Sequence, residues 1–263
     1  MTAPAPPEPH PKPNPKPKPV TPIVDDLPAW ILGMSAGMRA ILAGLTRVRI
    51  EGAVDRIPRE GPVIIAANHA SNLDVPVIGS SLMYRTGRRW QWLGKRELFD
   101  WPIVGVIARH GGVHAVDRGA ADVEAYRLAK RILDEGHVLF VFPEGTRSQD
   151  GRLQEAHDGA AVLALRTGAP IVPVGIAGSF DRWPRGQKLP HPGGRVTVRV
   201  GSPFRLADEL PAGLDRRSAT PMATELIMRR VAALVPADQR GRYSSPSAAP
   251  DAAGTPLPRT PEA

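Results

Sequence analysis

Apolar and polar positions follow two different periods along this chain, and the changes of period predict strands and helices in turn. Short apolar runs rich in β-branched residues are typical of buried strands, whereas apolar residues three or four positions apart are typical of helices. The predicted strands are residues 63–67, 90–94, 112–116, 138–142, 171–176 and 196–200. The predicted helices are residues 74–83, 101–109, 120–135, 159–167 and 222–234.

Strands that alternate with helices are typical of α/β domains. We therefore expect a single α/β domain over residues 49–235, with a mainly parallel sheet flanked by helices. Sites in such sheets form where strands end and loops begin, and the polar motifs of this chain sit at such junctions. Pro173 lies inside a predicted buried strand and cannot donate a ladder hydrogen bond, so it predicts an edge strand, a bulge or a deliberate gap.

A mostly apolar helical segment, residues 23–48, precedes the predicted domain. Arg39 and several glycines interrupt it, which makes it a poor candidate for a membrane span of about 20 apolar residues. Two interpretations stay open. The segment is either an interfacial helix with Trp30 at headgroup depth, or an ordinary helix packed on the core.

The two ends of the chain, residues 1–22 and 236–263, are rich in proline. The first is a Pro/Lys tract, and the second also contains serine, alanine and glycine. Proline fixes φ and lacks an amide N–H, so we expect both ends to be extended and disordered. We assign them no chemistry.

Composition narrows the classes of function. A chain of 263 residues is long enough to bury a core. It contains no cysteine, which excludes disulfides, thiolate metal sites and a cysteine nucleophile, and fits a reducing cytosol. We expect no signal peptide, because the start lacks an apolar stretch after a basic one. The net charge of +8 predicts an anionic partner, such as a nucleic acid, a lipid headgroup surface or a phosphate-bearing substrate.

The first polar motif places a histidine and a carboxylate five residues apart, directly after the predicted strand 63–67. If the chain turns there into a helix, His69 and Asp74 reach one rim of the sheet. The carboxylate can then accept from one imidazole nitrogen and leave the other to take a proton from a hydroxyl. The simpler interpretation is a histidine that caps the following helix, because a motif this short is not specific.

The second motif, Phe142-Pro143-Glu144-Gly145-Thr146-Arg147-Ser148, follows the most hydrophobic predicted strand. Proline stops the strand, and glycine permits a tight turn that exposes the polar side chains together. An arginine fork beside hydroxyls and backbone N–H groups is suited to phosphate. Arg118 also follows a predicted strand, and two converging arginines hold a phosphate dianion better than one. The alternatives are a solvated turn and, for Arg118, a surface ion pair with Asp117 or Asp122.

Together these motifs resemble the four ordered blocks of the glycerolipid acyltransferases, and most nearly those of the 1-acylglycerol-3-phosphate (lysophosphatidic acid) acyltransferases. The blocks run in the family's order over roughly residues 51–204. They comprise Asn68-His69 with Asp74, Lys95-x-Glu97-Leu98 through Gly105 to Asp117-Arg118, the Phe142–Ser148 motif, and Ile171-Val172-Pro173-Val174.

The resemblance implies that His69 is a general base and that Asp74 orients it. It also implies a direct transfer of a fatty acyl group from acyl-CoA or acyl carrier protein to the free hydroxyl of 1-acylglycerol-3-phosphate, giving phosphatidic acid. The thioester is a co-substrate, and no cofactor or metal is expected. The residues implied in binding the phosphorylated acceptor are Lys95, Arg118, Glu144, Gly145, Thr146, Arg147 and Ser148.

By the same resemblance we expect an enzyme at the cytoplasmic face of the cell membrane, peripheral or monotopic, with an anionic membrane surface as partner and no nucleic acid. Three alternatives are open. The acceptor is glycerol-3-phosphate, another lysophospholipid or a glycolipid; or water replaces the lipid hydroxyl, as in a thioesterase; or the protein binds nucleic acid. Residues 84–92 interleave cations with aromatics, as either a stacking platform or a positive rim for lipid or donor phosphates.

Overall fold

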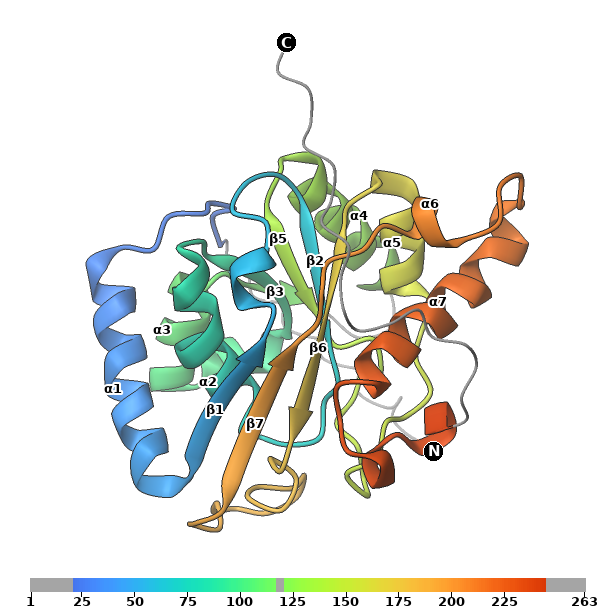
Figure 1. The fold of residues 1–263 in the computed structure, drawn as a ribbon. Coiled ribbons are helices and arrows are strands. Elements are labelled where there is room, and N and C mark those ends of the chain that lie inside the picture. The colour runs from blue at the N-terminus through green and yellow to red at the C-terminus, as the bar shows by residue number, and fades with distance from the viewer. Residues whose placement is uncertain (1–20, 117–120, 245–263) are drawn as a thin grey trace, which may run out of the picture.

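The computed structural model describes residues 21–116 and 121–244, and these fold around a seven-stranded sheet (Figure 1). The strand order is β1-β7-β6-β2-β5-β3-β4. The strands are β1 (Arg47–Gly52), β2 (Val63–Ala67), β3 (Trp90–Lys95), β4 (Val113–Val116), β5 (Val138–Val141), β6 (Ile171–Ala177) and β7 (Arg195–Val200).

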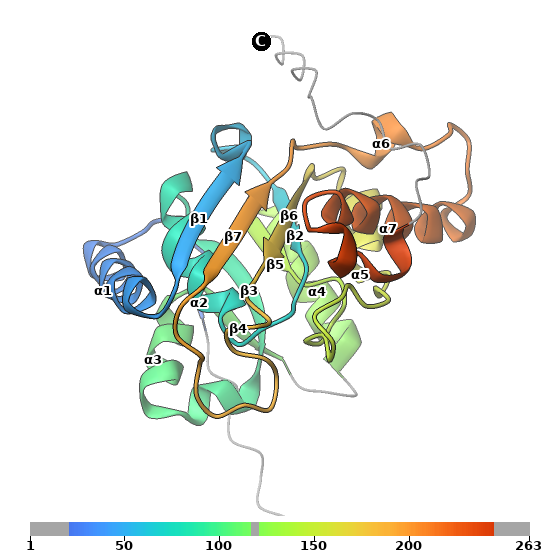
Figure 2. The ribbon, with the colours of Figure 1, turned by 60° about the horizontal axis from the view of Figure 1, so that its bottom comes forward.

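Helices cover both faces of this sheet, as the two views show (Figures 1 and 2). On one side lie α1 and α2, with α3 beside the β4 edge, and on the other side lie α4, α5 and α7. The helices are α1 (Ala29–Leu45), α2 (Asp74–Val77), α3 (Pro102–His110), α4 (Ala121–Asp134), α5 (Gly159–Thr167), α6 (Leu206–Glu209) and α7 (Arg216–Ala232).

Strand β2 shows why the sheet is buried on both faces. Its side chains alternate between two cores, because successive residues of a strand point to opposite faces. Val63 and Ile65 pack in the core that includes α1 and α2, while Ile64 and Ala66 pack in the core that includes α4, α5 and α7. All five β2 residues are fully buried, which explains the continuous apolar run in the sequence. The prediction of one α/β domain with a mainly parallel sheet is confirmed.

Strands β1 and β7 run against the other five, since β7 pairs antiparallel with β6 and β1 pairs parallel with β7. Strand β1 is not among the strands that the sequence predicts. Its residues alternate between polar and apolar, as in Arg47-Val48-Arg49-Ile50, so the signal of a half-exposed strand is present but short.

Two predicted helices differ from the structure. The helix predicted over 74–83 is α-helical only to Val77 and continues as a π turn, Ile78–Leu82, and a 3₁₀ turn, Met83–Thr86. Helix α7 begins six residues before the predicted start at 222. Asp215 caps it by accepting from the Ser218 backbone N–H at 2.8 Å, and the helix tolerates Pro221 in its interior.

Pro173 does not mark an edge strand, because β6 lies between β7 and β2 in the sheet. The β6–β7 ladder runs from Val174 to Ala177 on β6, so the proline stands just beyond its end. The Pro173 carbonyl still accepts from the Gly201 N–H at 2.9 Å. Of the three predicted explanations, the structure shows the gap. It lies at the end of the β6–β7 ladder, so the missing N–H of Pro173 removes no hydrogen bond from within that ladder.

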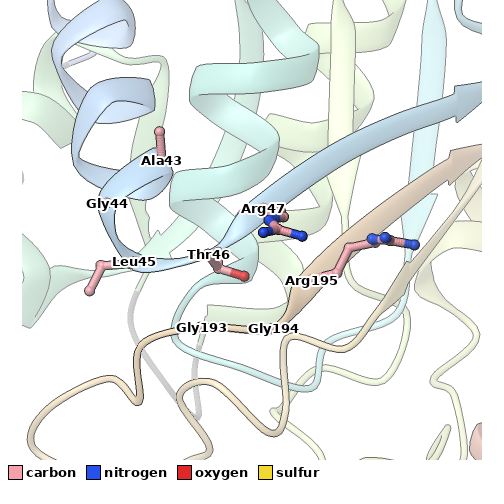
Figure 3. A pocket seen from close by; sticks show the side chains of 8 residues that line it. All are labelled: Ala43, Gly44, Leu45, Thr46, Arg47, Gly193, Gly194 and Arg195. Atoms are coloured by element: carbon pink, nitrogen blue, oxygen red, sulfur yellow. The ribbon is translucent and has the colours of Figure 1, made fainter.

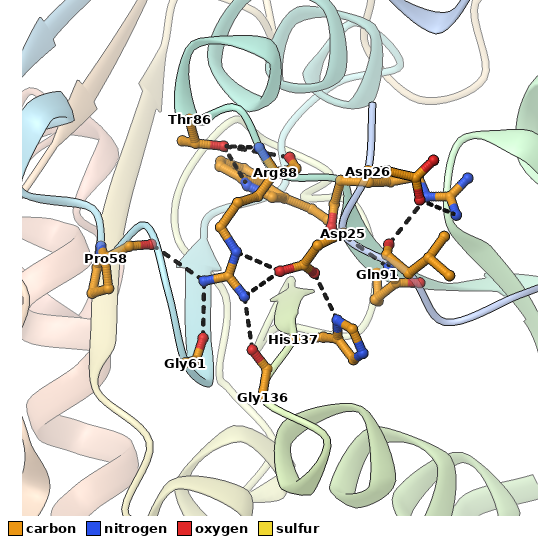
Figure 4. A network of polar contacts seen from close by, with 12 residues as sticks. Asp25, Asp26, Pro58, Gly61, Thr86, Arg88, Gln91, Gly136 and His137 are labelled. Carbon is orange, nitrogen blue, oxygen red and sulfur yellow. Dashed lines mark hydrogen bonds and ion pairs between the residues drawn. The ribbon is translucent and has the colours of Figure 1, made fainter. Parts of the chain in front are cut away.

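The segment 84–92 is not a surface platform or rim, since its two tryptophans and two of its arginines are buried. Arg88 donates to Asp25 and to the carbonyls of Pro58, Gly61 and Gly136 (Figure 4). His137 contacts the other Asp25 oxygen at 2.7 Å. Arg88 is buried, with 5% of its side chain exposed, whereas 34% of the Asp25 side chain is exposed. This network therefore fastens the segment before α1 to the amino-terminal edge of the sheet.

Helix α1 has one face buried in the protein and apolar side chains exposed on the rest of its surface. Ile31 and Leu42 are buried against the sheet, whereas Trp30, Leu32 and Ile41 are 41–59% exposed. Among the described residues, no helix has the length and apolar character needed to cross a membrane. The Asp117-Arg118 pair, residues 1–20 and residues 245–263 lie outside the described residues. The predicted disorder of residues 236–263 is wrong for 236–244, which form two 3₁₀ turns, Ala237–Gln239 and Gly241–Ser244, with Tyr243 buried.

Candidate active site

The candidate site lies at the edge where β2, β5 and β6 end (at the bottom in Figure 1). Asn68, the first residue after β2, fixes the chain there by bonding both ends of its amide to the backbone of Ile176 on β6. The two distances are 2.9 Å from Nδ2 to the carbonyl and 2.7 Å from the Ile176 N–H to Oδ1. These bonds continue the ladder past the strand end, so His69 leaves the sheet from a rigid position.

His69 and Asp74 form the predicted pair, with 2.9 Å between Nδ1 and Oδ2. The same carboxylate oxygen accepts from the backbone N–H groups of Ala70 and Ser71, at 2.7 Å each. Asp74 is fully buried, while 17% of the His69 side chain is exposed. No group in the described part of the chain bonds Nε2 of His69. An acceptor on Nδ1 favours the tautomer in which Nε2 is an available base.

The Phe142–Ser148 loop is fastened to His69 itself. Glu144 Oε1 accepts from the His69 backbone N–H at 2.8 Å, and the Ser148 N–H donates to the His69 carbonyl at 2.7 Å. The Phe142 ring stacks on the imidazole, with 3.8 Å between the centroids and 9° between the planes. His69 and Glu144 are 75 residues apart in the sequence. Their loops meet because β2 and β5 are neighbours in the sheet, so the two motifs form one surface.

Glu144 is a buried structural tie, not an exposed side chain of the turn as the sequence suggested. Its second oxygen accepts from the Gln154 backbone N–H at 2.7 Å, and only 2% of the residue is exposed. Burial raises the pKa of Glu144 to about 7, although the hydrogen bonds from Gln154 and His69 act in the opposite direction. Ser148 is also buried, and its hydroxyl donates to Asp150 at 3.0 Å.

Gly145 turns the loop at a φ of 66°, where a Cβ would lie 2.8 Å from Cδ2 of His157. The glycine is needed both for the left-handed backbone and for the close approach of His157. The turn leaves Thr146 exposed and directs Arg147 to the Oδ1 atom of Asn72. Arg147 therefore contacts the loop after β2 that contains His69.

Arg185 is a candidate site residue that sequence reasoning missed. It lies in the connection 178–194 between β6 and β7, and its Nη1 is 3.4 Å from the Thr146 hydroxyl. Burial and, second, the like charge of Arg185 lower the pKa of Arg147, while the charge of Asp74 acts in the opposite direction. The guanidinium groups of Arg147 and Arg185 are therefore close enough to repel one another. A phosphate dianion between them would offset this repulsion.

The position of Arg185 follows from how its connection is held. The Trp183 carbonyl accepts from the Asn72 N–H at 3.0 Å and from the Ser71 hydroxyl at 2.8 Å. The connection therefore folds back over the loop that carries His69. The sequence does show an arginine at Trp183-Pro184-Arg185. No motif or spacing there predicts that this segment folds over the His69 loop.

The remaining predicted site residues have different outcomes. Lys95 ends β3, two strands from β2 at the same edge of the sheet, and it is exposed. Arg118 lies outside the described residues. Within the described ranges, no three histidine, aspartate or glutamate side chains gather as a metal site would require.

Comparison with known proteins agrees with this geometry. The family described as Acyltransferase matches residues 47–177. A lyso-ornithine lipid O-acyltransferase of Pseudomonas aeruginosa is 30% identical in an alignment that covers 79% of this chain and 79% of that protein. A chloroplastic 1-acyl-sn-glycerol-3-phosphate acyltransferase of Arabidopsis thaliana is 31% identical over 60% of this chain, which spans 44% of that protein's length.

A solved structure shares the fold as well as the sequence pattern. The crystal structure of the 1-acyl-sn-glycerophosphate acyltransferase PlsC from Thermotoga maritima superposes with a TM-score of 0.60 at 28% identity, over 78% of each chain. Residues 47–177, which the family matches, contain both the His69–Asp74 pair and the Phe142–Ser148 loop. The chain therefore belongs to the acyltransferase family.

Proposed function

We propose that this protein transfers a fatty acyl group from a thioester donor, acyl-CoA or acyl carrier protein, to the free hydroxyl of 1-acylglycerol-3-phosphate. The observation that carries the proposal is the His69–Asp74 pair, with Nε2 of His69 unpartnered in the described part of the chain, beside a loop that presents Arg147. Relatives whose names state this activity support it.

In the proposed reaction His69 Nε2 takes the proton of the acceptor hydroxyl as its oxygen attacks the thioester carbonyl carbon. Asp74 stabilises the imidazolium that forms. The new C–O bond is complete when the C–S bond breaks, and the departing thiolate takes the proton back from His69. The donor is already activated, so the protein contributes proximity and proton transfer without a covalent intermediate.

We assign the acceptor phosphate to Arg147 and Arg185. A phosphate between two guanidinium groups accepts charge-assisted, bidentate hydrogen bonds and removes the repulsion between them. Thr146 lies beside Arg185 and offers a hydroxyl to the same group. Lys95, at the end of β3, and Arg118, which follows β4 in the sequence, belong to this proposal as further cations.

A second candidate acceptor is a lyso-ornithine lipid. The Pseudomonas relative named for it matches more of its own length than the Arabidopsis relative named for the phosphate acceptor, 79% against 44%. The His69–Asp74 base serves either hydroxyl equally. The two candidates differ in the headgroup that the arginines must bind, so a comparison of the two acceptors distinguishes them.

We also propose that the protein works on an anionic membrane surface, at the cytoplasmic face of the cell membrane. Support comes from large apolar side chains that α1 and α3 leave exposed. Trp30 contacts His110 edge-to-face at 4.9 Å, which joins the two helices into one surface. The exposed residues there are Trp30 and Ile41 on α1, and Trp101, Val104, Val106 and Ile107 at α3. Tryptophan is typical of membrane interfaces.

The proposed base is tested by His69→Ala. We expect kcat/KM for acyl transfer to fall about 10²- to 10⁴-fold, because a positioned base contributes a factor of this size. The measurement is transfer of labelled acyl groups from acyl-CoA to lysophosphatidic acid, with His191→Ala, an exposed histidine of the same edge, as control. Unchanged transfer by the His69 variant, with a normal circular dichroism spectrum, would refute the mechanism.

The proposed phosphate site is tested by Arg185→Ala and Arg147→Ala. Each should raise the KM for lysophosphatidic acid about tenfold, since a charge-assisted hydrogen bond is lost, with a smaller change for a lyso-ornithine lipid. Arg216→Ala, an exposed arginine at the start of α7, is the matched control. Equal losses with both acceptors would mean that the arginines do not bind the phosphate.

The proposed membrane surface is tested by the double variant Trp30→Ser and Trp101→Ser. We expect the fraction that sediments with anionic vesicles to fall several-fold, because two interfacial side chains are removed. Val123→Ser on α4, across the sheet, removes an equally exposed apolar side chain and should leave sedimentation unchanged. If both proteins lose binding alike, α1 and α3 are not the docking surface.

The raised pKa of Glu144 predicts how stability varies with pH. A carboxyl whose pKa rises from 4.5 to about 7 on folding stabilises fully below pH 4.5, and this contribution is lost as pH rises to about 7. The free energy of unfolding of the wild type, minus that of Glu144→Gln, should therefore fall by about 3 kcal/mol between pH 4 and pH 8. Urea unfolding measures it, with exposed Glu60→Gln as control. A flat difference would show that folding does not raise the pKa of Glu144.

A further inference from the structure

A groove of about 470 Å³ opens between the end of α1 and the start of β7 (Figure 3). It is separate from the His69–Asp74 pair and takes no part in the proton transfer described above. The chain segments that line it are Ala43, Gly44, Leu45, Thr46 and Arg47 from the α1–β1 junction, and Gly193, Gly194 and Arg195 from the start of β7. Its volume falls in the range of small-molecule sites.

The groove concentrates positive charge. Arg47 and Arg195 are the first residues of two paired strands and stand directly opposite one another in the register. Like charges in register destabilise a sheet unless something neutralises them. The Arg182 guanidinium does not line the groove but lies beside it, since its Cζ is 3.1 Å from where a Cβ on Gly194 would be. Glycine at that position therefore leaves room for a third guanidinium.

No carboxylate in the described ranges pairs with Arg47 or Arg195. Farther along the same strands, Glu51 lies 3.2 Å from Arg199 and 4.0 Å from Arg49, so those arginines have an acidic partner. The cations at the mouth of the groove differ from their neighbours in this respect. An anionic ligand would supply the missing charge.

A buried hydroxyl is the second observation that points to a ligand. Thr46 lines the groove and is 3% exposed, and its Oγ1 has no hydrogen-bond partner among the described residues. Figure 3 shows this oxygen directed toward the space between Arg47 and Arg195. Leaving a buried hydroxyl unpaired costs about 1–3 kcal/mol, which a ligand oxygen would offset.

The groove lies at the same edge of the sheet as His69. Because β1 and β7 run against β2 and β6, their first residues stand where β2 and β6 end. In the strand order, β7 is two positions and β1 three positions from β2. At about 4.8 Å per strand, the groove is about 10–14 Å across the edge from the strand that carries His69.

We propose that this groove binds the phosphate groups of a coenzyme A thioester, the acyl donor. The inference rests on the acyl transfer proposed above. The acceptor phosphate has its own cations at Arg147 and Arg185, next to His69, so a second cationic site farther along the edge fits a ligand whose phosphates lie at a distance from its reacting carbonyl. Guanidinium groups suit such phosphates because they donate two parallel hydrogen bonds.

Calorimetric titration with coenzyme A itself tests the proposal without acyl transfer. We expect the double variant Arg47→Ala and Arg195→Ala to bind coenzyme A at least tenfold more weakly than the wild type, and Thr46→Val to bind a few-fold more weakly. Arg49→Ala, the adjacent arginine that faces Glu51, is the matched control and should bind normally. Pantetheine, which lacks the phosphates, should show no dependence on the two arginines.

A companion variant, Arg47→Lys with Arg195→Lys, keeps both charges and should retain most of the affinity, so a folding defect in the alanine variant does not decide the test. A lower melting temperature with unchanged affinity for coenzyme A would overturn the proposal, because the arginines would then only offset the carbonyl end of α1. Lost binding to anionic vesicles with unchanged affinity for coenzyme A would overturn it in favour of lipid headgroups.

The two proposals fail in distinguishable ways. If the wild type binds coenzyme A through these arginines but transfers no acyl group to any acceptor, the groove stands and the acyl transfer fails. If the protein transfers acyl groups from acyl-CoA while the double variant binds coenzyme A as well as the wild type does, the groove proposal fails alone. His69→Ala should bind coenzyme A normally in either case.

Discussion

The buried carboxylate of Asp74 is the interaction on which the site depends. One of its oxygens accepts from Nδ1 of His69 and from two backbone N–H groups at the turn into α2. A buried carboxylate is costly unless it is hydrogen-bonded, and three donors satisfy Oδ2, while Oδ1 has no partner among the described residues. The same bonds fix the carboxylate and, through it, the imidazole plane. The orientation of His69 is therefore a consequence of how the chain leaves β2.

The second constraint is that the two motifs are joined through backbone groups. Glu144 and Ser148 bond the N–H and carbonyl of His69, so the loop after β5 and the loop after β2 move as one unit. The side chains at the surface of this unit, Thr146 and Arg147, are then available for a ligand. This division explains why Glu144 and Ser148 are buried while Thr146 is exposed, and why burial raises the pKa of Glu144.

Because β7 runs antiparallel to β6, the connection between them lies at the same edge of the sheet as His69 and brings further arginines there. The connection between β6 and β7 crosses the site, and it carries Arg185 toward Arg147 and Arg182 toward the groove beside Arg195. Two groups of cations thus stand at one edge of the sheet, separated by a few strand spacings. For a reaction between two phosphate-bearing substrates, this separation suits one group to each substrate, with the base between them.

The sequence by itself determined the elements that depend on local pattern. Continuous apolar runs predicted the buried strands, and the motifs that follow β2 and β5 predicted that His69 meets Asp74 and that a polar loop follows β5. These succeed because side-chain period and strand ends are local properties. The short alternation of β1, with two arginines in four residues, was too weak a signal to predict a strand.

Tertiary structure decided which charged side chains are buried and which lie at the candidate site. Arg88 and Arg89 looked like surface cations beside aromatics, yet they are buried against Asp25 and backbone carbonyls, because the segment before α1 folds over them. Arg185, in a connection without regular pattern, lies instead at the site. Glu144 is internal for the same kind of reason. The sequence gives the charged residues. Whether a charged side chain is exposed or bonded to an internal partner depends on chain segments that are distant in sequence and adjacent in space.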